Sequence, residues 1–472
     1  MFDNIKRWII RGIDKMLSKS TIEDALKIRI AISDEMDNAM KLWLQIFTNN
    51  APWINKEISS QEIGASISEE FARLTTLEMK FNVSGSKRAD FINKQLEEIL
   101  KILKTKVALF DAVGGGFFKP YVKDNKFYID YIPQTDCKPI AFNDAGGITS
   151  IVFSSQVTKG DVIYTRLEIH TLQENKYIVE NKVYRTELNN PSVLGRPASL
   201  SDVLEWSNLS EREVIENVEK PLFSYYKVPL TNNIDPKSCL GVSVYNKATD
   251  NIKKLDIQEA RLDYEYDSAE RSIYADVNAL KNKDGTARRQ KIIKTIDSDE
   301  DNFYKEFSPS IRDENFIRGS NKIKQNIEFQ CHLSYGTISD PSMIEKTATE
   351  IEASKQRSYS TVSQMQRSLE DALKHLVYIL DVYCDLYELA PSGKYEISSD
   401  WDDSIIEDKS SKKVIDMQEV SAGLKSKKRY LMENYGMSET EAQKELDDIA
   451  NEKKNSTVFN EYNLNNNEDG EE

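Results

Sequence analysis

Cysteine and histidine are scarce in this chain of 472 residues. The 4 cysteines stand alone without a C-x-x-C pair, which argues against a disulfide framework and a zinc site and favours a reducing cytoplasm. Cys331 and His332 are adjacent, but no further ligand stands at metal-binding spacing, so we interpret them as a half-buried helix end. No metal or other cofactor is therefore expected.

Long hydrophobic runs are also missing. No apolar run approaches the ~18 residues that a membrane span needs, so no membrane partner is expected. The first residues, MFDNIKRWIIRGIDKMLSK, are interrupted by charges and lack the continuous apolar core of a signal peptide. Their apolar positions fall at helical spacing, which favours a packed helix over a helix on a membrane surface.

An excess of positive charge is absent as well. The chain holds 63 Lys and Arg against 78 Asp and Glu, a net charge of −15. It is poorly suited to gripping nucleic acid, because affinity for phosphates comes from clustered basic side chains. The C-terminal stretch, NSTVFNEYNLNNNEDGEE, is rich in Asn and acidic residues and predicts a disordered tail.

Three consecutive glycines, Gly114 to Gly116, raise the possibility of a phosphate-binding loop. Such a loop leads directly into a helix whose N–H groups face the anion. Here the glycines lead into Pro120 and an alternating strand, in which Phe127 and Ile129 share one face. The segment therefore predicts a β-hairpin and no nucleotide site.

Catalytic motifs are not found, so an enzyme is not expected. The chain contains no G-x-S-x-G and no H-E-x-x-H sequence. A metal-dependent nuclease using Asp400, Asp402 and Asp403 remains an alternative. A strand would point the side chains of Asp402 and Asp403 to opposite faces, which disfavours a shared metal.

The periodicity changes several times along the chain. Residues 1–110 are mostly helical in pattern, and residues 116–186 alternate as the strands of a meander. The loop NNPSVLGRPASLSD follows, and the helical pattern returns at Leu240.

Two long apolar seams indicate long amphipathic helices. One seam runs from Tyr245 to Ile273 and the other from Val362 to Leu386. Between them lie short strand-like runs at 274–310, a polar helix at about 311–330, and the loop HLSYGTISDPSMIEK. Core helices of an ordinary bundle would give the same seams, so periodicity leaves the architecture open.

Five segments in order carry a resemblance to a known family. They are GGGFFKPYVKDNKFYIDYIPQTDCKPI, LGVSVYNKATDNIKKLDIQEARLDYEYDSAER, SPSIRDENFIRGSNKIKQNIEFQCHLSYGTIS, KTATEIEASKQRSYSTVSQMQRSLEDALKHL and WDDSIIEDK. Together they resemble the portal proteins of tailed bacteriophages, in the family found in phages of Gram-positive hosts. The resemblance extends from about residue 40 to 450.

The resemblance implies an α+β, portal-like fold with an α/β wing, a two-helix stem, a small mixed clip, a long wing helix and a helical crown. The implied parts are N-terminal helices and an α/β wing with a β-meander (1–241), a stem helix (242–272), the clip (273–310), a second stem helix (311–330), a tunnel loop (331–347), the long wing helix and following segment (348–403), the crown (404–454) and an acidic disordered tail (455–472).

It also implies a role and partners. Portal proteins form a ring, usually dodecameric, at the unique capsid vertex of the virion, where the genome is packaged and ejected, and they assemble in the bacterial host cytoplasm. The implied partners are copies of the chain itself, the major capsid and scaffolding proteins, the terminase large subunit, a head–tail adaptor, and double-stranded DNA that passes through without tight binding. Another phage structural ring, such as a connector or baseplate component, is the main alternative.

The tunnel loop supplies the candidate DNA-facing residues. Gly336 and Pro341 break the helical pattern there, and flanking helices are expected to hold the ends of the loop while its tip moves. On this basis, replacing Ser339 to Met343 with bulkier residues should leave ring assembly and capsid incorporation unchanged but block or sharply slow DNA packaging. A plain surface turn is the alternative. The candidates are Ser334, Tyr335, Thr337, Ser339, Asp340, Ser342, Met343 and Lys346.

Overall fold

Helices and strands are mixed throughout this computed structural model, which confirms the α+β class. The structure describes residues 17–77, 79–190, 193–269, 272–276, 293–296, 304–307, 310–343, 347–401 and 409–450. The chain forms two compact units, Met1–Asp400 and Trp401–Glu472. The expected N-terminal helix and the expected acidic tail lie outside the described residues, apart from Leu17 at the end of the former.

The first part of the chain is helical, as predicted. Its helices are α2 (Lys19–Leu26), α3 (Asp34–Phe47), α4 (Ile63–Thr76), α5 (Lys87–Leu100) and α6 (Leu103–Val113). Serine side chains at Ser18, Ser33 and Ser86 accept hydrogen bonds from backbone N–H groups in the first turns of α2, α3 and α5, which explains where these helices begin. Strand β1 (Met79–Ser84) was not predicted, and neither was its partner β14 (Glu396–Trp401).

The glycine-led segment forms the predicted hairpin. Strands β2 (Gly115–Lys123) and β3 (Lys126–Pro133) pair antiparallel, and β10 (Ser224–Lys227) joins the other edge of β2. Asp124 and Asn125 form the two-residue turn, with φ of 51° and 56°. This left-handed backbone suits Asp and Asn in a tight hairpin.

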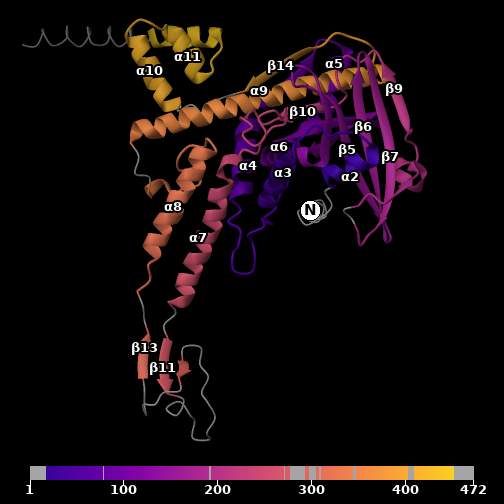
Figure 1. Ribbon diagram of the computed structural model, residues 1–472. Coiled ribbons are helices and arrows are strands. Elements are labelled where there is room, and N and C mark those ends of the chain that lie inside the picture. The colour runs from indigo at the N-terminus through magenta and orange to yellow at the C-terminus, as the bar shows by residue number, and fades with distance from the viewer. Residues whose placement is uncertain are drawn as a thin grey trace, which may run out of the picture. The chain divides into compact units, whose positions relative to one another are not determined.

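A larger meander follows, also as predicted (Figure 1). Its strands are β4 (Cys137–Phe142), β5 (Ile148–Lys159), β6 (Val162–Gln173), β7 (Lys176–Glu187), β8 (Arg196–Ala198) and β9 (Arg212–Glu216). The segment NNPSVLGRPASLSD, predicted to be a loop, contributes the short edge strand β8.

The three glycines permit close backbone approach in place of anion binding. A Cβ on Gly116 would lie 2.1 Å from the Phe110 ring, and one on Gly114 would lie 2.5 Å from the carbonyl oxygen of Gly241. Helix α6 ends at Gly114, whose φ of 97° favours glycine. The glycines thus let β2 and residues near 241 pack against the end of α6.

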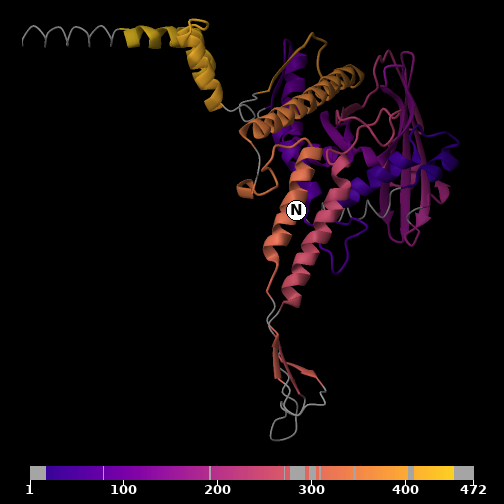
Figure 2. The same cartoon turned by 60° about the vertical axis from the view of Figure 1, so that its left-hand side comes forward.

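Helices α7 (Thr249–Ser268) and α8 (Asp313–Gln330) run side by side away from the sheets in both views (Figures 1 and 2). The Asn251 amide donates to Gln330 at 2.8 Å near one end of the pair, and Arg312 contacts Glu265 at 2.7 Å near the other. The pair is therefore antiparallel. Beyond it lie β11 (Ser272–Asp276), β12 (Ile293–Ile296) and β13 (Tyr304–Phe307), where strand-like runs were predicted.

Helix α7 is shorter than the predicted helix. The apolar seam begins at Tyr245, but Tyr245 precedes α7 and packs in the core with its hydroxyl donating to the Trp43 carbonyl at 2.7 Å. In the distal half of the seam, Tyr266 is 43% exposed. The seam is therefore buried within this chain only near its first half.

Helix α9 (Ala348–Leu386) matches the second predicted seam. It begins with a capping box, in which Thr347 and Glu350 each accept a hydrogen bond from the other's backbone N–H. Val362, Met365, Leu369, Leu376 and Ile379 along the seam are fully buried. The helix lies across strands β2 and β10 and helices α4 and α5.

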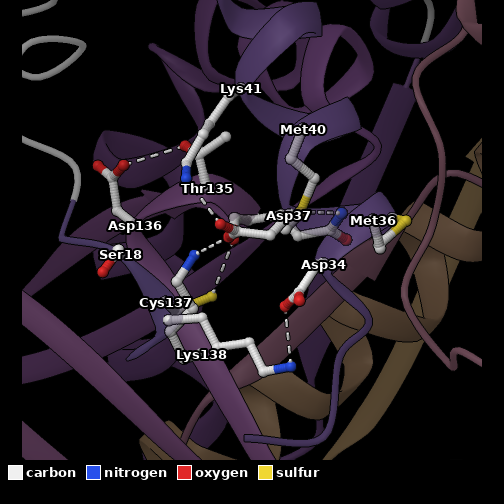
Figure 3. A network of polar contacts seen from close by, with 12 residues as sticks. Ser18, Asp34, Met36, Asp37, Met40, Lys41, Thr135, Asp136, Cys137 and Lys138 are labelled. Carbon is white, nitrogen blue, oxygen red and sulfur yellow. Dashed lines mark hydrogen bonds and ion pairs between the residues drawn. The ribbon is translucent and has the colours of Figure 1, made fainter. Parts of the chain in front are cut away.

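Two ionic contacts connect distant parts of the first unit. The buried Arg88 guanidinium of α5 donates to Asp381 at 2.9 Å and to Asp385 at 2.5 Å, both on α9. Asp37 of α3 lies between Lys138 at 2.6 Å and Lys41 at 2.8 Å (Figure 3). Burial alone would raise the pKa of Asp37, but the two ammonium groups outweigh it and hold that pKa below its usual value.

The second unit contains α10 (Lys409–Ser421), α11 (Lys427–Tyr435) and a further helical stretch at residues 439–450. The Lys425 ammonium bridges Asp416 at 2.8 Å and Glu433 at 2.5 Å, which joins the two labelled helices. These helices agree with the helical character predicted for this part of the chain.

We expect Gly116→Ala to lower the free energy of unfolding by about 1–3 kcal/mol, because the added methyl group overlaps the buried Phe110 ring. Gly319→Ala is the matched control, since its Cβ would meet only the flexible end of Gln258 at 3.3 Å. Urea denaturation measures both. Equal stability of the two variants would contradict the close-approach explanation.

His375 on α9 should make the fold sensitive to acid. Burial lowers its pKa to about 4, although the ring also hydrogen-bonds the Pro221 carbonyl. Between about pH 6.5 and 4 the unfolded chain binds a proton that the folded chain does not, so stability falls as pH falls, by at most about 3 kcal/mol. His375→Gln should lose less stability than wild type between pH 7 and 4.5 in urea titrations. Equal losses of stability in wild type and His375→Gln would contradict the role given to His375.

Candidate functional site

The segment between α8 and α9 begins with a sharp reversal of the chain. Cys331 ends α8 and is buried, and burial raises the pKa of its thiol. His332 follows with φ of 62°, in the left-handed region, and is half-buried. Both positions agree with the predicted half-buried helix end.

A buried carboxylate of α8 holds the centre of this loop. The Glu328 side chain is fully buried, and its Oε1 accepts the backbone N–H groups of Ile338 and Ser339, each at 2.8 Å. Its Oε2 accepts the Ser339 hydroxyl at 2.8 Å. These three hydrogen bonds fix the backbone at residues 338–339.

Both flanking helices add further anchors. Asn321 of α8 accepts the Asp340 N–H at 2.8 Å, and Ser354 of α9 accepts the Tyr335 N–H at 2.9 Å. The Asp340 carboxylate in turn accepts the Ser342 N–H and hydroxyl at 2.8 and 2.7 Å, which lowers the pKa of Asp340. The described part of the loop is therefore anchored at several positions between residues 335 and 342, and not only at its ends.

The candidate residues do not share one environment. Four side chains are exposed to solvent in the chain, those of Thr337, Asp340, Ser342 and Met343. Ser334 and Tyr335 are half-buried, and Lys346 lies outside the described residues. Ser339 is only 4% exposed, because its hydroxyl is turned toward Glu328.

The expectation that Ser339 tolerates a bulkier residue stays a prediction, but the burial of Ser339 within the chain argues against it. A larger side chain there would displace the Glu328 carboxylate from its donors, and an unpaired buried carboxylate is costly. The expectation is compatible with Ser342 and Met343, which project into solvent.

Sequence reasoning missed the residues that hold the loop. Asn321 and Glu328 lie seven positions apart on one face of α8, in a helix predicted only as polar. The seven-residue spacing of a polar pair was the available signal. It did not show that the face is buried, since that depends on the loop that follows.

Two basic side chains, Lys247 and Arg357, lie near His332 of the loop. Burial lowers the pKa of His332, and the nearby charges of Lys247 and Arg357 lower it further. The Arg357 guanidinium lies over the Phe329 ring at 4.6 Å. At neutral pH the imidazole is therefore neutral and suited to its contact with the Thr361 hydroxyl at 3.2 Å.

Of the three carboxylates of the alternative nuclease site, the structure describes only that of Asp400. Asp400 lies 3.9 Å from Lys80, and Asp402 and Asp403 lie outside the described residues. Elsewhere in the described ranges, no group of three or more His, Cys, Asp or Glu side chains is placed to hold a metal ion. No helix that the structure describes is both long and apolar enough to cross a membrane.

Comparison with known families connects this loop to one of them. Residues 319–457 match the family model described as phage portal protein, SPP1 Gp6-like. This segment is similar to phage portal proteins. The match confirms the resemblance inferred from sequence, and the portal segment contains the whole loop together with α9, α10 and α11. No curated protein matches the chain.

We expect Glu328→Ala to release the loop, because it leaves two N–H groups and the Ser339 hydroxyl without their acceptor. Amide hydrogen exchange at Ile338 and Ser339 should accelerate by about tenfold or more, which corresponds to a loss of about 1.4 kcal/mol. Glu328→Gln is the control, since its amide oxygen can still accept both N–H groups. Unchanged protection in the alanine variant would contradict the role given to Glu328.

Proposed function

We propose that this chain is the subunit of a ring-shaped portal through which a tailed phage packages and ejects its double-stranded DNA. The observation that carries the proposal is the portal-family match over residues 319–457. In this proposal the ring, most often of twelve copies in the family, occupies the unique vertex of the capsid. Its partners are the capsid and scaffolding proteins, the terminase large subunit and a head–tail adaptor.

The architecture of the first unit supports this assignment of parts. We assign α7 and α8 to the stem and the sheet of β11, β12 and β13 to the clip, because the helix pair extends from the sheets with the small sheet beyond it (Figures 1 and 2). We assign residues 331–347 to the tunnel loop and α9 to the wing helix. The sheet of β10, β2 and β3 and the six-stranded sheet form the wing, and α10 and α11 belong to the crown.

The chemistry of the loop suits passage of DNA without tight binding. The exposed side chains in its described part are the polar Thr337, Ser342 and Thr347, the acidic Asp340 and the apolar Pro341 and Met343. A side chain of this kind forms no ion pair with phosphate, and each fixed phosphate contact would slow a sliding duplex. An acidic, polar loop therefore limits adhesion.

The anchoring contacts give the loop a mechanical role in the proposal. Glu328 and Asn321 connect its backbone to α8, and Ser354 connects it to α9. A force on the loop would reach both helices through hydrogen bonds, one of them to a charged carboxylate. A contact between DNA and the loop would thus be transmitted mechanically to the stem and to the wing.

Purified protein should form closed rings with a central channel without added nucleotide or metal, as seen by electron microscopy and weighed by mass photometry. A monodisperse monomer across a wide concentration range would contradict the proposal. A ring without a channel wide enough for duplex DNA would favour another structural ring of the virion.

Enlarging the exposed part of the loop should impair DNA passage. We expect Ser342→Trp with Met343→Trp to leave ring assembly and capsid incorporation unchanged but to reduce packaged DNA per procapsid severalfold, because these side chains project from the anchored backbone. Ser210→Trp, at an exposed position between β8 and β9, is the control for adding a tryptophan in place of an exposed serine. Normal packaging by correctly assembled double-mutant rings would remove the loop from the channel.

A further inference from the structure

The helix pair α7–α8 exposes large apolar side chains to solvent. Tyr264 is 72% exposed and Phe329 is 55% exposed, with Tyr266 and Ile317 at 43% and 39%. Clusters of exposed aromatic residues on one element mark protein interfaces more often than free surface. The charges around them indicate what the partner is.

One side of α7 is acidic. Asp263 and Asp267 are exposed and stand two residues before and two residues after Glu265, whose carboxylate contacts Arg312 of α8. Residues two apart on a helix point to nearly opposite sides, so both aspartates point away from α8. With the exposed Tyr264 they form what we call the acidic edge.

A side of α8 is basic. Arg318, Lys322 and Phe329 recur at spacings of four and seven, lie on one face of the helix and are all exposed. The Arg357 guanidinium stacked on Phe329 adds a further positive charge. We call Arg318, Lys322 and Phe329 the basic face.

The acidic edge and the basic face cannot meet within one chain. The ion pair between Glu265 and Arg312 sets the register of the two helices. At ~1.5 Å per residue, Asp263 and Arg318 are offset by about 6 Å along the helix pair, and the centres of the two charged pairs by about 12 Å. The acidic edge points away from α8 and therefore away from the basic face. Opposite charges displayed in different directions suit contact between two copies.

We propose that the acidic edge of one copy binds the basic face of the next copy around the ring. Asp263 and Asp267 pair with Arg318 and Lys322, and the exposed aromatic side chains pack between them. The interface is heterologous, because the two surfaces are different, and repeating such a contact closes a ring. This inference rests on the proposed function and names the partner of the stem.

Charge reversal tests the pairing in the full-length protein. The variant Asp263→Lys/Asp267→Lys and the variant Arg318→Glu/Lys322→Glu should each lose most ring formation, because each places like charges across the interface. Mixed in equal amounts, the two variants should regain rings in which they alternate, since each contact then joins opposite charges. Mass photometry with one variant carrying a mass tag measures both ring yield and alternation.

A matched variant keeps the test specific. Asp144→Lys/Glu174→Lys makes the same charge change at exposed turns of the large sheet and should form rings like wild type. If wild type forms rings and both stem variants form them equally well alone, the interface is wrong while the portal assignment stands. If the basic variant forms normal rings that package little DNA, the basic face contacts DNA and the inference fails. Absence of wild-type rings would instead overturn the proposed function.

Discussion

The burial of the α9 seam is the contact on which the first unit depends. From Val362 to Leu380 the apolar side chains of this seam are almost completely removed from water, at ~25 cal/mol for each Å² of apolar surface. The surrounding elements are fixed to the same helix by polar contacts: the Ser368 hydroxyl donates to the Lys227 carbonyl, and Ser224 donates to Ala372. Strand β10, and through it the hairpin of β2 and β3, thus takes its position from α9.

Buried charged groups restrict the arrangement of the core more narrowly than apolar burial alone does. Glu168 lies among Lys119, Arg166 and His170 on the large sheet, and although burial alone would raise its pKa, these neighbours hold it well below its usual value. Such groups add less net stability than an apolar core, but each has only one arrangement that satisfies it. The loop after α8 follows the same rule, because the position of Glu328 admits one path for residues 338–339.

Local pattern was sufficient where the neighbours of a residue in sequence are also its neighbours in space. The seam of α9 and the hairpin of β2 and β3 were predicted closely, because helical spacing and strand alternation are local properties. The start of α7 was not, since Tyr245 is held by Trp43, about two hundred residues earlier. Burial of Glu328 and Ser339 was likewise invisible, because a polar residue gives no sign in sequence of whether a partner covers it.

The Arg88 contact has a consequence for synthesis of the chain. Arg88 and Asp381 are 293 residues apart, so at ~5–20 residues per second the ribosome needs roughly 15–60 s between them. During that interval α5 exists without the carboxylates that its guanidinium requires in a buried setting. Contacts of such long range also slow folding, because the intervening chain must be ordered before they form. The nascent first unit therefore completes its core only when α9 has left the ribosome, and a chain interrupted before α9 remains a substrate for chaperones.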